Sequence, residues 1–381
     1  MRVEDKDDLI LRGIFVSDIH FGATKDADRL YSELNKYLLK KIRTLCKENK
    51  LDYVIIGGDL YDREVGMNEK PGRLASKFIL TLNNLSIKYG FFLGIIKGTL
   101  RHDYNQLEVF RKLELTNKNF RIFSTCEEYI LDEEGYIKFL MIPEEYMEDP
   151  DEFYSEVYQN NTEDTAYDFI FGHGTFDFAG YVSKLLTSEQ NVKNAPTFKA
   201  KQFKDMTLGC TIFGHIHIKT EDEENGIYYP GSFSRSAFGE EEKKGYYYIE
   251  YNLETCETSL EFIINKGAPT YKTIDGDLLP TDIVKKSKKL EKLKEKYDFI
   301  RIKSTRTVQN DTDLQILQNY AEKDDSVKVE IKKIEIEDDS DDHTFDFIIN
   351  RECSFEESIS RFIKIKTGED VSENDVKNIL S

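Results

Sequence analysis

The stretch FFLGIIKGTLRHDY, residues 91–104, reads as a short apolar strand that ends at Gly98 and is soon followed by the pair His102 and Asp103. A short apolar run bounded by glycine is typical of a strand that is buried on both faces. In α/β sheets, functional side chains lie in the loops just beyond the strand ends. The stretch therefore predicts a buried strand that delivers a histidine and a carboxylate to a functional site.

The segments before this stretch alternate between strand-like and helix-like patterns. Strand-like runs are LRGIFVSDIH (11–20), LDYVIIGGD (51–59) and FFLGIIKG (91–98), and helix-like runs cover 27–50 and 72–90. The first helix-like run has apolar residues at helical spacing, namely Leu30, Leu34, Leu38, Ile42 and Leu45. This β-α-β-α-β order predicts an α/β fold in which helices cover a sheet.

Further strand-like runs follow, closely spaced and rich in aromatic residues. They are YIKFLMI (136–142), YDFIFGHG (167–174), CTIFGHIHI (210–218), GIYYPGSF (226–233) and KGYYYIEYN (244–252). Their spacing predicts a second sheet packed on the first. We therefore expect two packed β-sheets flanked by helices.

A turn-rich stretch at 265–280 indicates a domain boundary. Beyond it come a lysine-rich helix, a strand, a second helix and a second strand, then an acidic run and a tail that fits two short amphipathic helices. We expect four parts: a main domain (1–268), a small α/β domain (269–337), an acidic linker (338–353) and a helical segment (354–381).

The composition is that of a globular chain without a membrane span. Its 381 residues are enough for two or three domains, and no apolar run is longer than a strand. The acidic start has no signal-peptide pattern. The five cysteines are scattered without a CxxC pair, which indicates neither a disulfide framework nor a zinc ribbon. We expect a reduced, cytoplasmic protein.

The net charge of −19 would by itself disfavour nucleic acid as a partner. The charge is unevenly distributed, however, because residues 285–306 are basic and residues 337–342 are acidic. Bound divalent metals would also reverse the sign of a carboxylate-rich pocket. Charge alone therefore leaves the partner open.

Five of the six histidines fall at strand ends, next to glycine or an acid. They are His20, His102, His173, His215 and His217, and the strand ends add Asp18, Asp59 and Asp62. Imidazole and carboxylate together suit manganese, iron or zinc, and the absence of thiolates argues against structural zinc. A pair of such ions about 3.5–4 Å apart can stabilise the attacking and leaving oxygens of a phosphoryl centre. Each motif alone is equally compatible with a packed histidine, but all of them in order predict a metal site.

The ordered motifs DIHFG (18–22), GDLYDR (58–63), HD (102–103), GHG (172–174) and GHIH (214–217) resemble those of the calcineurin-like metallophosphoesterases. The later segment YYPGSFSRSAFGEEEKKGYYYIE (228–250) is similar to the SbcD-type DNA repair nucleases and their phage, archaeal and eukaryotic counterparts. The resemblance covers about residues 10–265 and is only architectural beyond them.

The resemblance implies a site with two Mn²⁺ ions. Asp18, His20 and His217 would hold the first ion, Asp59 would bridge both, and His173 and His215 would hold the second. His102 would act as the general acid, with Asp103 fixing its tautomer. Asp62 and Arg63 could ligate a metal, but we favour a role in anchoring their loop.

One motif departs from the family pattern. The family has Gly-Asn-His-Asp, with the asparagine oxygen on the second metal, whereas here Gly98 is followed by Thr99, Leu100 and Arg101 before His102. Thr99 could supply a hydroxyl in place of the asparagine, or a water could fill the position. Arg101 could contact a phosphate or simply be an exposed loop residue.

The resemblance also implies the reaction and the partners. We expect a manganese-dependent DNA exonuclease and endonuclease, a homodimer through residues 70–115, in a bacterial cell or a phage-infected host. It would serve as the nuclease subunit of a repair or recombination complex with an SMC-like coiled-coil ABC-type ATPase. The small domain would cap the site and bind DNA, and the helical segment 354–381 would dock on the ATPase. The lysines expected at DNA are Lys285, Lys286, Lys288 and Lys289, although a solvated helix face explains them equally well.

Two alternative functions stay open. One is a phosphoesterase of the same fold that acts on a phosphoprotein or a small phosphate ester. The other is a scaffold subunit with a degraded metal site, which the altered motif at 98–103 favours.

Overall fold

The computed structural model describes residues 9–24, 26–132, 135–159, 166–178, 196–279, 283–304 and 326–331. The chain divides into two compact units, residues 1–273 with 289–300 and residues 274–288 with 301–381. The predicted acidic linker (338–353) and helical docking segment (354–381) lie outside the described residues. The boundary at residue 268 stays a prediction.

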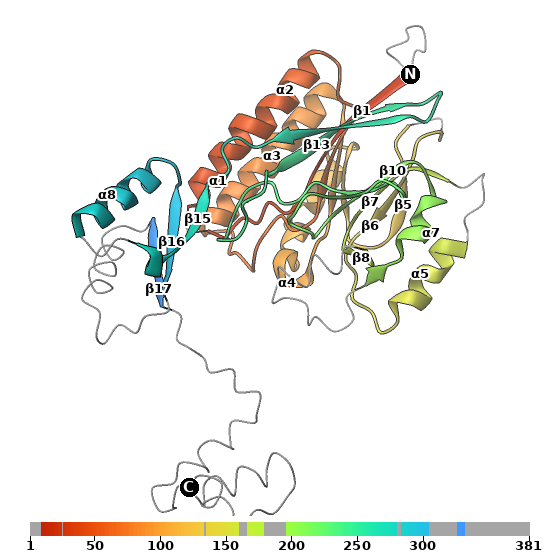
Figure 1. The fold of residues 1–381 in the computed structure, drawn as a ribbon. Coiled ribbons are helices and arrows are strands. Elements are labelled where there is room, and N and C mark those ends of the chain that lie inside the picture. Colours follow the sequence, from red (N-terminus) through yellow and green to blue (C-terminus); the bar gives the residue numbers. More distant parts are fainter. Residues whose placement is uncertain are drawn as a thin grey trace, which may run out of the picture. The chain divides into compact units, whose positions relative to one another are not determined.

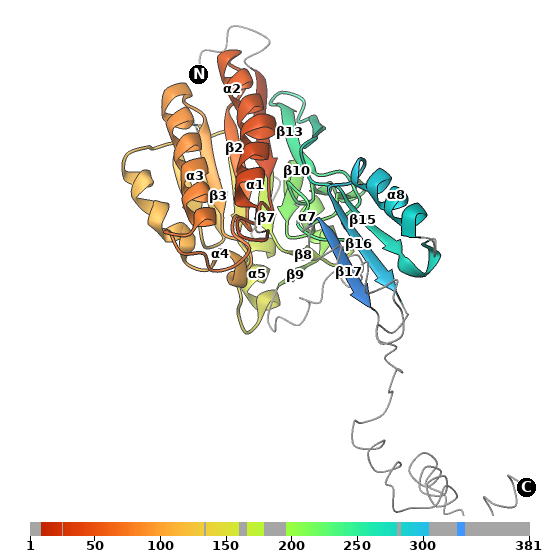
Figure 2. The same cartoon turned by 90° about the vertical axis from the view of Figure 1, so that its left-hand side faces the viewer.

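The first unit contains two six-stranded sheets, with helices on the outer side of each (Figures 1 and 2). Helices α1 (Ala27–Glu33), α2 (Lys40–Lys47) and α3 (Lys70–Tyr89) cover the first sheet, and α5 (Pro150–Gln159) and α7 (Ala200–Lys204) cover the second. This arrangement confirms the predicted α/β fold of two packed sheets flanked by helices.

The first sheet has the strand order β14-β13-β1-β2-β3-β4. Its strands are β1 (Ile10–Val16), β2 (Tyr53–Gly57), β3 (Phe92–Ile96), β4 (Phe120–Phe123), β13 (Gly245–Asn252) and β14 (Thr258–Ile264). Strands β1 to β4 are parallel, whereas β13 pairs antiparallel with β1 and β14 pairs antiparallel with β13.

The second sheet has the order β11-β12-β10-β7-β6-β5. Its strands are β5 (Glu127–Ile130), β6 (Lys138–Ile142), β7 (Tyr167–His173), β10 (Thr207–Gly214), β11 (Thr220–Asp222) and β12 (Ile227–Tyr229). The inner strands are parallel, and β5 and β11 are antiparallel edges.

One predicted strand belongs to the other sheet. We expected residues 244–252 in the second sheet, but β13 pairs with β1 in the first, with Tyr247 opposite Phe15. The strand is buried along nearly its whole length. A strand that is apolar on both faces carries no signal that tells one sheet from the other.

Three apolar clusters hold the layers together. Because side chains alternate along a strand, Ile14 and Val16 of β1 face the helix layer with Leu38 of the first helical segment, whereas Phe15 faces the second sheet with Phe171. A third cluster lies between the second sheet and its helices and includes Ile170, Tyr154 and Phe203. Strands buried on both sides leave only their ends free to carry polar groups.

The remaining elements of the first unit are short. Between α1 and α2 the helix contains a π-helical segment, η2 (Leu34–Leu39), so the predicted helix over 27–50 is continuous but not uniform. After β3 come α4 (Leu100–Asp103) and the 3₁₀ segment η3 (Gln106–Leu115), and β8 (Thr175–Phe176) pairs with β9 (Thr197–Phe198).

A three-stranded sheet follows in the last described part of the chain. It contains β15 (Tyr271–Asp275), β16 (Phe299–Ser304) and β17 (Val327–Ile331), with η5 (Gly276–Leu278) and helix α8 (Ile283–Lys294) between the first two strands in sequence. The predicted lysine-rich helix and the strands on either side of residues 305–325 are therefore present. No helix within the described ranges has the length and apolar character needed to cross a membrane.

Candidate metal centre

Polar side chains from the strand ends of both sheets converge at one place. Asp18 and His20 follow β1, Asp59 follows β2, Thr99, His102 and Asp103 follow β3, Glu144 follows β6, His173 ends β7, and His215 and His217 follow β10. The carboxyl ends of parallel strands are where α/β sheets place their sites. The structure thus brings together the histidines and aspartates that the sequence predicts as metal ligands.

Four of these residues have a left-handed backbone. The φ angle is 53° at Asp18, 56° at His20, 49° at Asp59 and 93° at His215. A residue other than glycine pays about 1–2 kcal/mol for this conformation, although aspartate and histidine adopt it more readily than most. Such strain collects at functional sites because the surrounding fold enforces it. Here the left-handed backbone directs the four side chains towards the site, just after the strands end.

Two glycines permit the close packing of these loops. A Cβ atom on Gly98 would lie 2.2 Å from Asp59 Oδ1, and one on Gly58 would lie 2.3 Å from His173 Nδ1. Both distances are far below van der Waals contact, so a larger residue would displace a side chain of the site.

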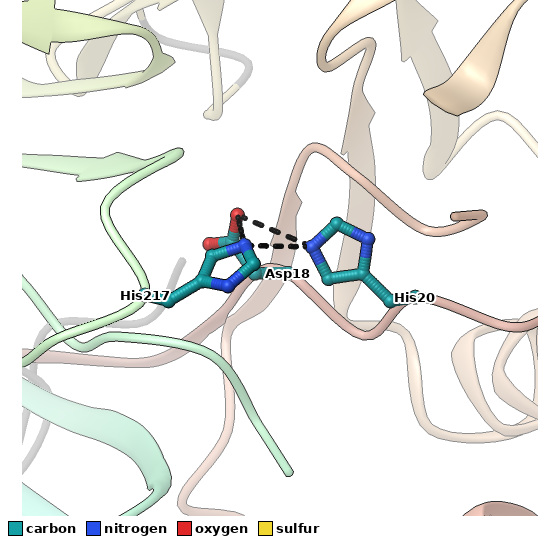
Figure 3. Close-up of side chains that lie close together, drawn as sticks. All are labelled: Asp18, His20 and His217. Atoms are coloured by element: carbon teal, nitrogen blue, oxygen red, sulfur yellow. Dashed lines mark hydrogen bonds and ion pairs between the residues drawn. The ribbon is translucent and has the colours of Figure 1, made fainter. Parts of the chain in front are cut away.

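Asp18, His20 and His217 form the first group of metal-ligating atoms (Figure 3). His20 Nε2 lies 2.9 Å from His217 Nε2. Asp18 Oδ1 lies 3.9 Å from the first of these nitrogens and 3.7 Å from the second. Two ring nitrogens and a carboxylate oxygen therefore face one position.

The segment before β13 supports His217. Glu240 Oε1 lies 3.7 Å from His217 Nδ1, and the buried Lys244 ammonium donates to the His217 carbonyl at 2.9 Å. Burial lowers the pKa of His217, but the Glu240 carboxylate outweighs it and the pKa lies above its ordinary value. A carboxylate on Nδ1 leaves Nε2 directed at the metal position. Both supporting residues belong to the segment 228–250 that the sequence singled out.

Asp59, His173 and His215 form the second group. Asp59 Oδ2 lies 3.3 Å from His173 Nε2 and 4.0 Å from His20 Nε2, so this carboxylate stands between the two groups. The other ring nitrogen of His173, Nδ1, lies 2.8 Å from the Gly57 carbonyl. Because a carbonyl only accepts, Nδ1 carries the proton and Nε2 faces the site.

Glu144 is a site residue that the sequence analysis missed. It is 5% exposed, and its Oε2 lies 3.2 Å from His215 Nδ1 and 3.6 Å from His173 Nε2. It follows the end of β6 by two residues, as Asp18 follows β1 and Asp59 follows β2. This position after a predicted strand was the available signal. An acid in a charged loop is usually solvated, however, so the signal was weak.

The buried acids Asp59 and Glu144 both have lowered pKa values. Burial raises the pKa of Asp59, but the adjacent His173 ring outweighs it and holds that pKa well below its ordinary value. Burial likewise lowers the pKa of His173, yet Asp59 holds it well above the ordinary value. For Glu144, the neighbouring His215 overcomes burial and the pKa lies below its usual range.

Both groups fit divalent metal ions. Ionised carboxylates are costly to bury unless positive charge compensates them. Imidazole and carboxylate are also the donor types that first-row divalent ions prefer. Asp59 Oδ2 lies within 4.0 Å of a histidine of each group, as a ligand shared by two ions requires.

His102 lies beside the first group. Its ring meets that of His20 edge-on, with the centroids 4.9 Å apart. Its Nδ1 lies 2.5 Å from the carbonyl oxygen of Asp62, and because a carbonyl only accepts, Nδ1 is the donor in this contact. Asp62 Oδ1 also lies 3.5 Å from His20 Nδ1, which makes Asp62 a support for two histidines.

Asp103 has a different role from the predicted one. Its carboxylate accepts hydrogen bonds from the backbone N–H groups of Gly98 (2.8 Å), Asp59 (3.1 Å) and Tyr61 (3.1 Å). Successive residues of a helix such as α4 point about 100° apart, so His102 and Asp103 face different partners. The Asp62 carbonyl fixes the His102 tautomer, and Asp103 ties the loop after β2 to the loop after β3. Burial, followed by the charge of Asp59, raises the pKa of Asp103 to about 7.

The predicted DNA contacts differ in exposure. Arg101 and the α8 residues Lys285, Lys288 and Lys289 are exposed. Lys286 is 6% exposed, because it lies on the opposite face of the helix from Lys288. Its burial removes it from the side chains that could meet a phosphate backbone.

Comparison with known proteins agrees with this geometry. The sequence profile described as calcineurin-like phosphoesterase matches residues 11–219, which contain both ligand groups and His102. The "Putative phosphoesterase 078R" of Invertebrate iridescent virus 3 is 26% identical over 69% of this chain and 73% of its own. SbcD, a subunit of the SbcCD nuclease of Staphylococcus epidermidis, is 23% identical over 77% of this chain and 78% of its own. The chain therefore belongs to the calcineurin-like phosphoesterase family and is a metal-dependent phosphoesterase.

Proposed function

We propose that this phosphoesterase is a manganese-dependent DNA nuclease that cleaves phosphodiester bonds from duplex ends and within strands. The observation that carries the proposal is the shared position of Asp59 between two ligand groups, with His102 beside the first. When bound, two divalent ions polarise the phosphoryl oxygens and neutralise the charge that develops on them.

The side chains divide into metal ligands and a proton donor. We assign Asp18, His20 and His217 to the first ion, Asp59 to both, and His173 and His215 to the second. The His102 ring is held through Nδ1 by the Asp62 carbonyl. Its Nε2, once protonated, can donate to the leaving oxygen of the phosphodiester. Asp103 holds the loop that carries His102 by accepting from the Gly98 backbone N–H.

DNA is the favoured substrate for two reasons. The bacterial relative is named as part of a nuclease and aligns over 77% of this chain. Helix α8 also presents the exposed side chains of Lys285, Lys288 and Lys289, spaced so that several can follow a phosphate backbone. Arg101 lies exposed next to His102 and is a further candidate for phosphate contact.

We also propose that the chain acts as one subunit of a larger complex. The relative's name describes a subunit, and the SMC-like ABC-type ATPase and the homodimer through residues 70–115 remain our predictions for this chain. The acidic net charge of −19 fits a protein whose partner supplies much of the DNA affinity.

The first test is cleavage of linear duplex and single-stranded DNA by the purified chain, with Mn²⁺ or Mg²⁺, alone and with an added ATPase subunit. We expect cleavage with Mn²⁺ and a loss of at least ~100-fold in His102→Ala at unchanged metal content. Lys47→Ala changes an exposed lysine at the end of α2, ahead of β2, and is the control that should cleave like the parent chain.

The same assay separates the two alternatives. Hydrolysis of p-nitrophenyl phosphate without DNA cleavage would establish a phosphoesterase for phosphoproteins or small esters. A metal content well below two ions per chain, without hydrolysis of either substrate, would establish a scaffold subunit.

A further inference from the structure

Glu144 is a buried carboxylate that none of the recognised motifs contains. It follows β6 in the loop PEEY (143–146), and its side chain is 2% exposed. Its ion-pair partners in the described part of the chain are His173 and His215. An ionised carboxylate so deeply buried requires compensation by nearby positive charge.

The distances around Glu144 match those between ligands of a single ion. Ligand atoms about 2.1 Å from one ion lie about 3.0 Å apart in octahedral geometry and about 3.4 Å apart in tetrahedral geometry. Glu144 Oε2 is 3.2 Å from His215 Nδ1 and 3.6 Å from His173 Nε2. Asp59 Oδ2 completes the chain of contacts at 3.3 Å from His173 Nε2.

The other oxygen of Glu144 is held in place. Tyr146 donates its hydroxyl hydrogen to Glu144 Oε1 at 2.5 Å, and the Glu144 backbone N–H donates to the Lys97 carbonyl at 3.2 Å. Partners of this kind orient a metal ligand and set its basicity. They leave Oε2 as the oxygen directed at the two histidines.

Thr99 lies between the carboxylates of Asp59 and Glu144. Its Oγ1 is 3.1 Å from Glu144 Oε2 and 3.2 Å from Asp59 Oδ2, and it lies 3.4 Å from each of His173 Nε2 and His215 Nδ1. Its backbone N–H donates to Asp59 Oδ1 at 2.6 Å. The hydroxyl has one hydrogen to donate, and both of these neighbours accept. A neutral hydroxyl between two carboxylates is therefore suited to position them, and the carboxylates are the stronger ligands for a divalent ion.

We propose that Glu144 is a direct ligand of the second metal ion and that Thr99 positions its carboxylate without binding the ion. This inference rests on the two-metal site proposed above, but not on DNA as the substrate. The second ion then has two carboxylates and two imidazoles, from Asp59, Glu144, His173 and His215. The altered motif at 98–103 does not degrade the site, because the missing ligand comes from the other sheet.

The test measures binding of Mn²⁺ alone, by isothermal titration and by metal analysis after gel filtration. The parent chain should bind two ions, Glu144→Ala should bind one, and Glu144→Gln should bind the second at least tenfold more weakly. Thr99→Val should still bind two ions, with a smaller loss of affinity for the second ion than Glu144→Gln shows. Glu148→Gln, an exposed acid of the same loop, is the matched control and should bind like the parent chain.

Electron paramagnetic resonance gives a readout independent of activity. Two Mn²⁺ ions that share Asp59 are spin-coupled, so the parent chain should give a coupled spectrum and Glu144→Ala the spectrum of an isolated ion. Circular dichroism of each variant shows whether it folds. If Glu144→Ala does not fold, Glu144→Gln still tests the inference, because glutamine preserves the shape of the side chain.

Each outcome decides the inference. Two ions with unchanged affinity in both Glu144 variants would overturn it, as would loss of the second ion in Thr99→Val alone, which would make Thr99 the ligand. A single ion in the parent chain would overturn it together with the two-metal site. Two ions that depend on Glu144, without DNA cleavage, would uphold the inference and reject only the nuclease.

Discussion

At the scale of single residues, the site depends on glycine positions that have no room for a side chain. Gly98 is such a place, since a Cβ there would lie 2.2 Å from Asp59 Oδ1 and 2.3 Å from the Asp59 backbone nitrogen. Neither atom can move away, because Asp59 is shared by the two ligand groups and its N–H is bonded to Asp103. Gly98→Ala should therefore lower the free energy of unfolding by about 2–3 kcal/mol and abolish binding of the second Mn²⁺. Urea unfolding in EDTA and metal analysis measure the two effects.

Gly90→Ala is the control for this prediction. It also changes a glycine, at the end of α3 with φ 81°, but a Cβ there would meet nothing within 4 Å. It should cost about 1 kcal/mol from its backbone conformation and leave metal binding intact. Parent-like stability and metal content in Gly98→Ala would show that the two loops are not packed as described.

At the scale of elements, the buried strands were predictable and their partners were not. The apolar runs at 51–59, 91–98 and 167–174 are strands of the structure because burial on both faces requires an unbroken apolar pattern. Because residues 244–252 have the same unbroken apolar pattern, the sequence did not indicate which sheet they join. It also hid the π-helical segment η2, because the leucines at 34 and 38 fit an ordinary helix equally well. Five of the six histidines could be predicted as site residues from their residue type and position, whereas Glu144 could not be told from a surface acid.

Asp168 in β7 lets us predict how the stability of the second sheet depends on pH. Its carboxylate accepts from the Lys138 N–H of β6 at 2.8 Å and from the Tyr251 hydroxyl of β13 at 2.9 Å. Burial, only partly offset by these hydrogen bonds, raises its pKa above the ordinary 3.8. The folded protein thus holds this proton to higher pH than the unfolded chain. Stability from this residue is present below about pH 3.8 and falls as the pH rises through the folded pKa.

Asp168→Asn removes that dependence and preserves the shape of the side chain. We expect the variant to gain stability relative to the parent chain as the pH rises from about 4 to about 7, with both in EDTA. Urea midpoints across this range measure the difference. Parallel curves for the two proteins would contradict the prediction.

At the scale of the whole molecule, metal binding should couple to the stability of the fold. The ligands come from β1, β2, β7 and β10, so an ion binds both sheets of the folded chain and none of the unfolded one. At about 100 times its dissociation constant, an ion adds about 2.7 kcal/mol. For a unit of this size, that raises the melting temperature by roughly 4–5 °C.

Thermal melting in EDTA and in increasing Mn²⁺ checks this coupling. Asp59→Asn, which keeps the shape of the shared ligand but not its charge, should show a clearly smaller rise. An equal rise in both proteins would mean that Mn²⁺ binds elsewhere.

The left-handed backbone at Asp18, His20, Asp59 and His215 has a consequence for the speed of metal uptake. We expect the surrounding fold, and not the ion, to hold these residues in their inward orientation, so that no loop has to rearrange before an ion enters. Uptake should then follow a single exponential whose rate rises in proportion to Mn²⁺ concentration without reaching a plateau. The slow step would be the loss of water from the ion, and the protein would act as a rigid receptor.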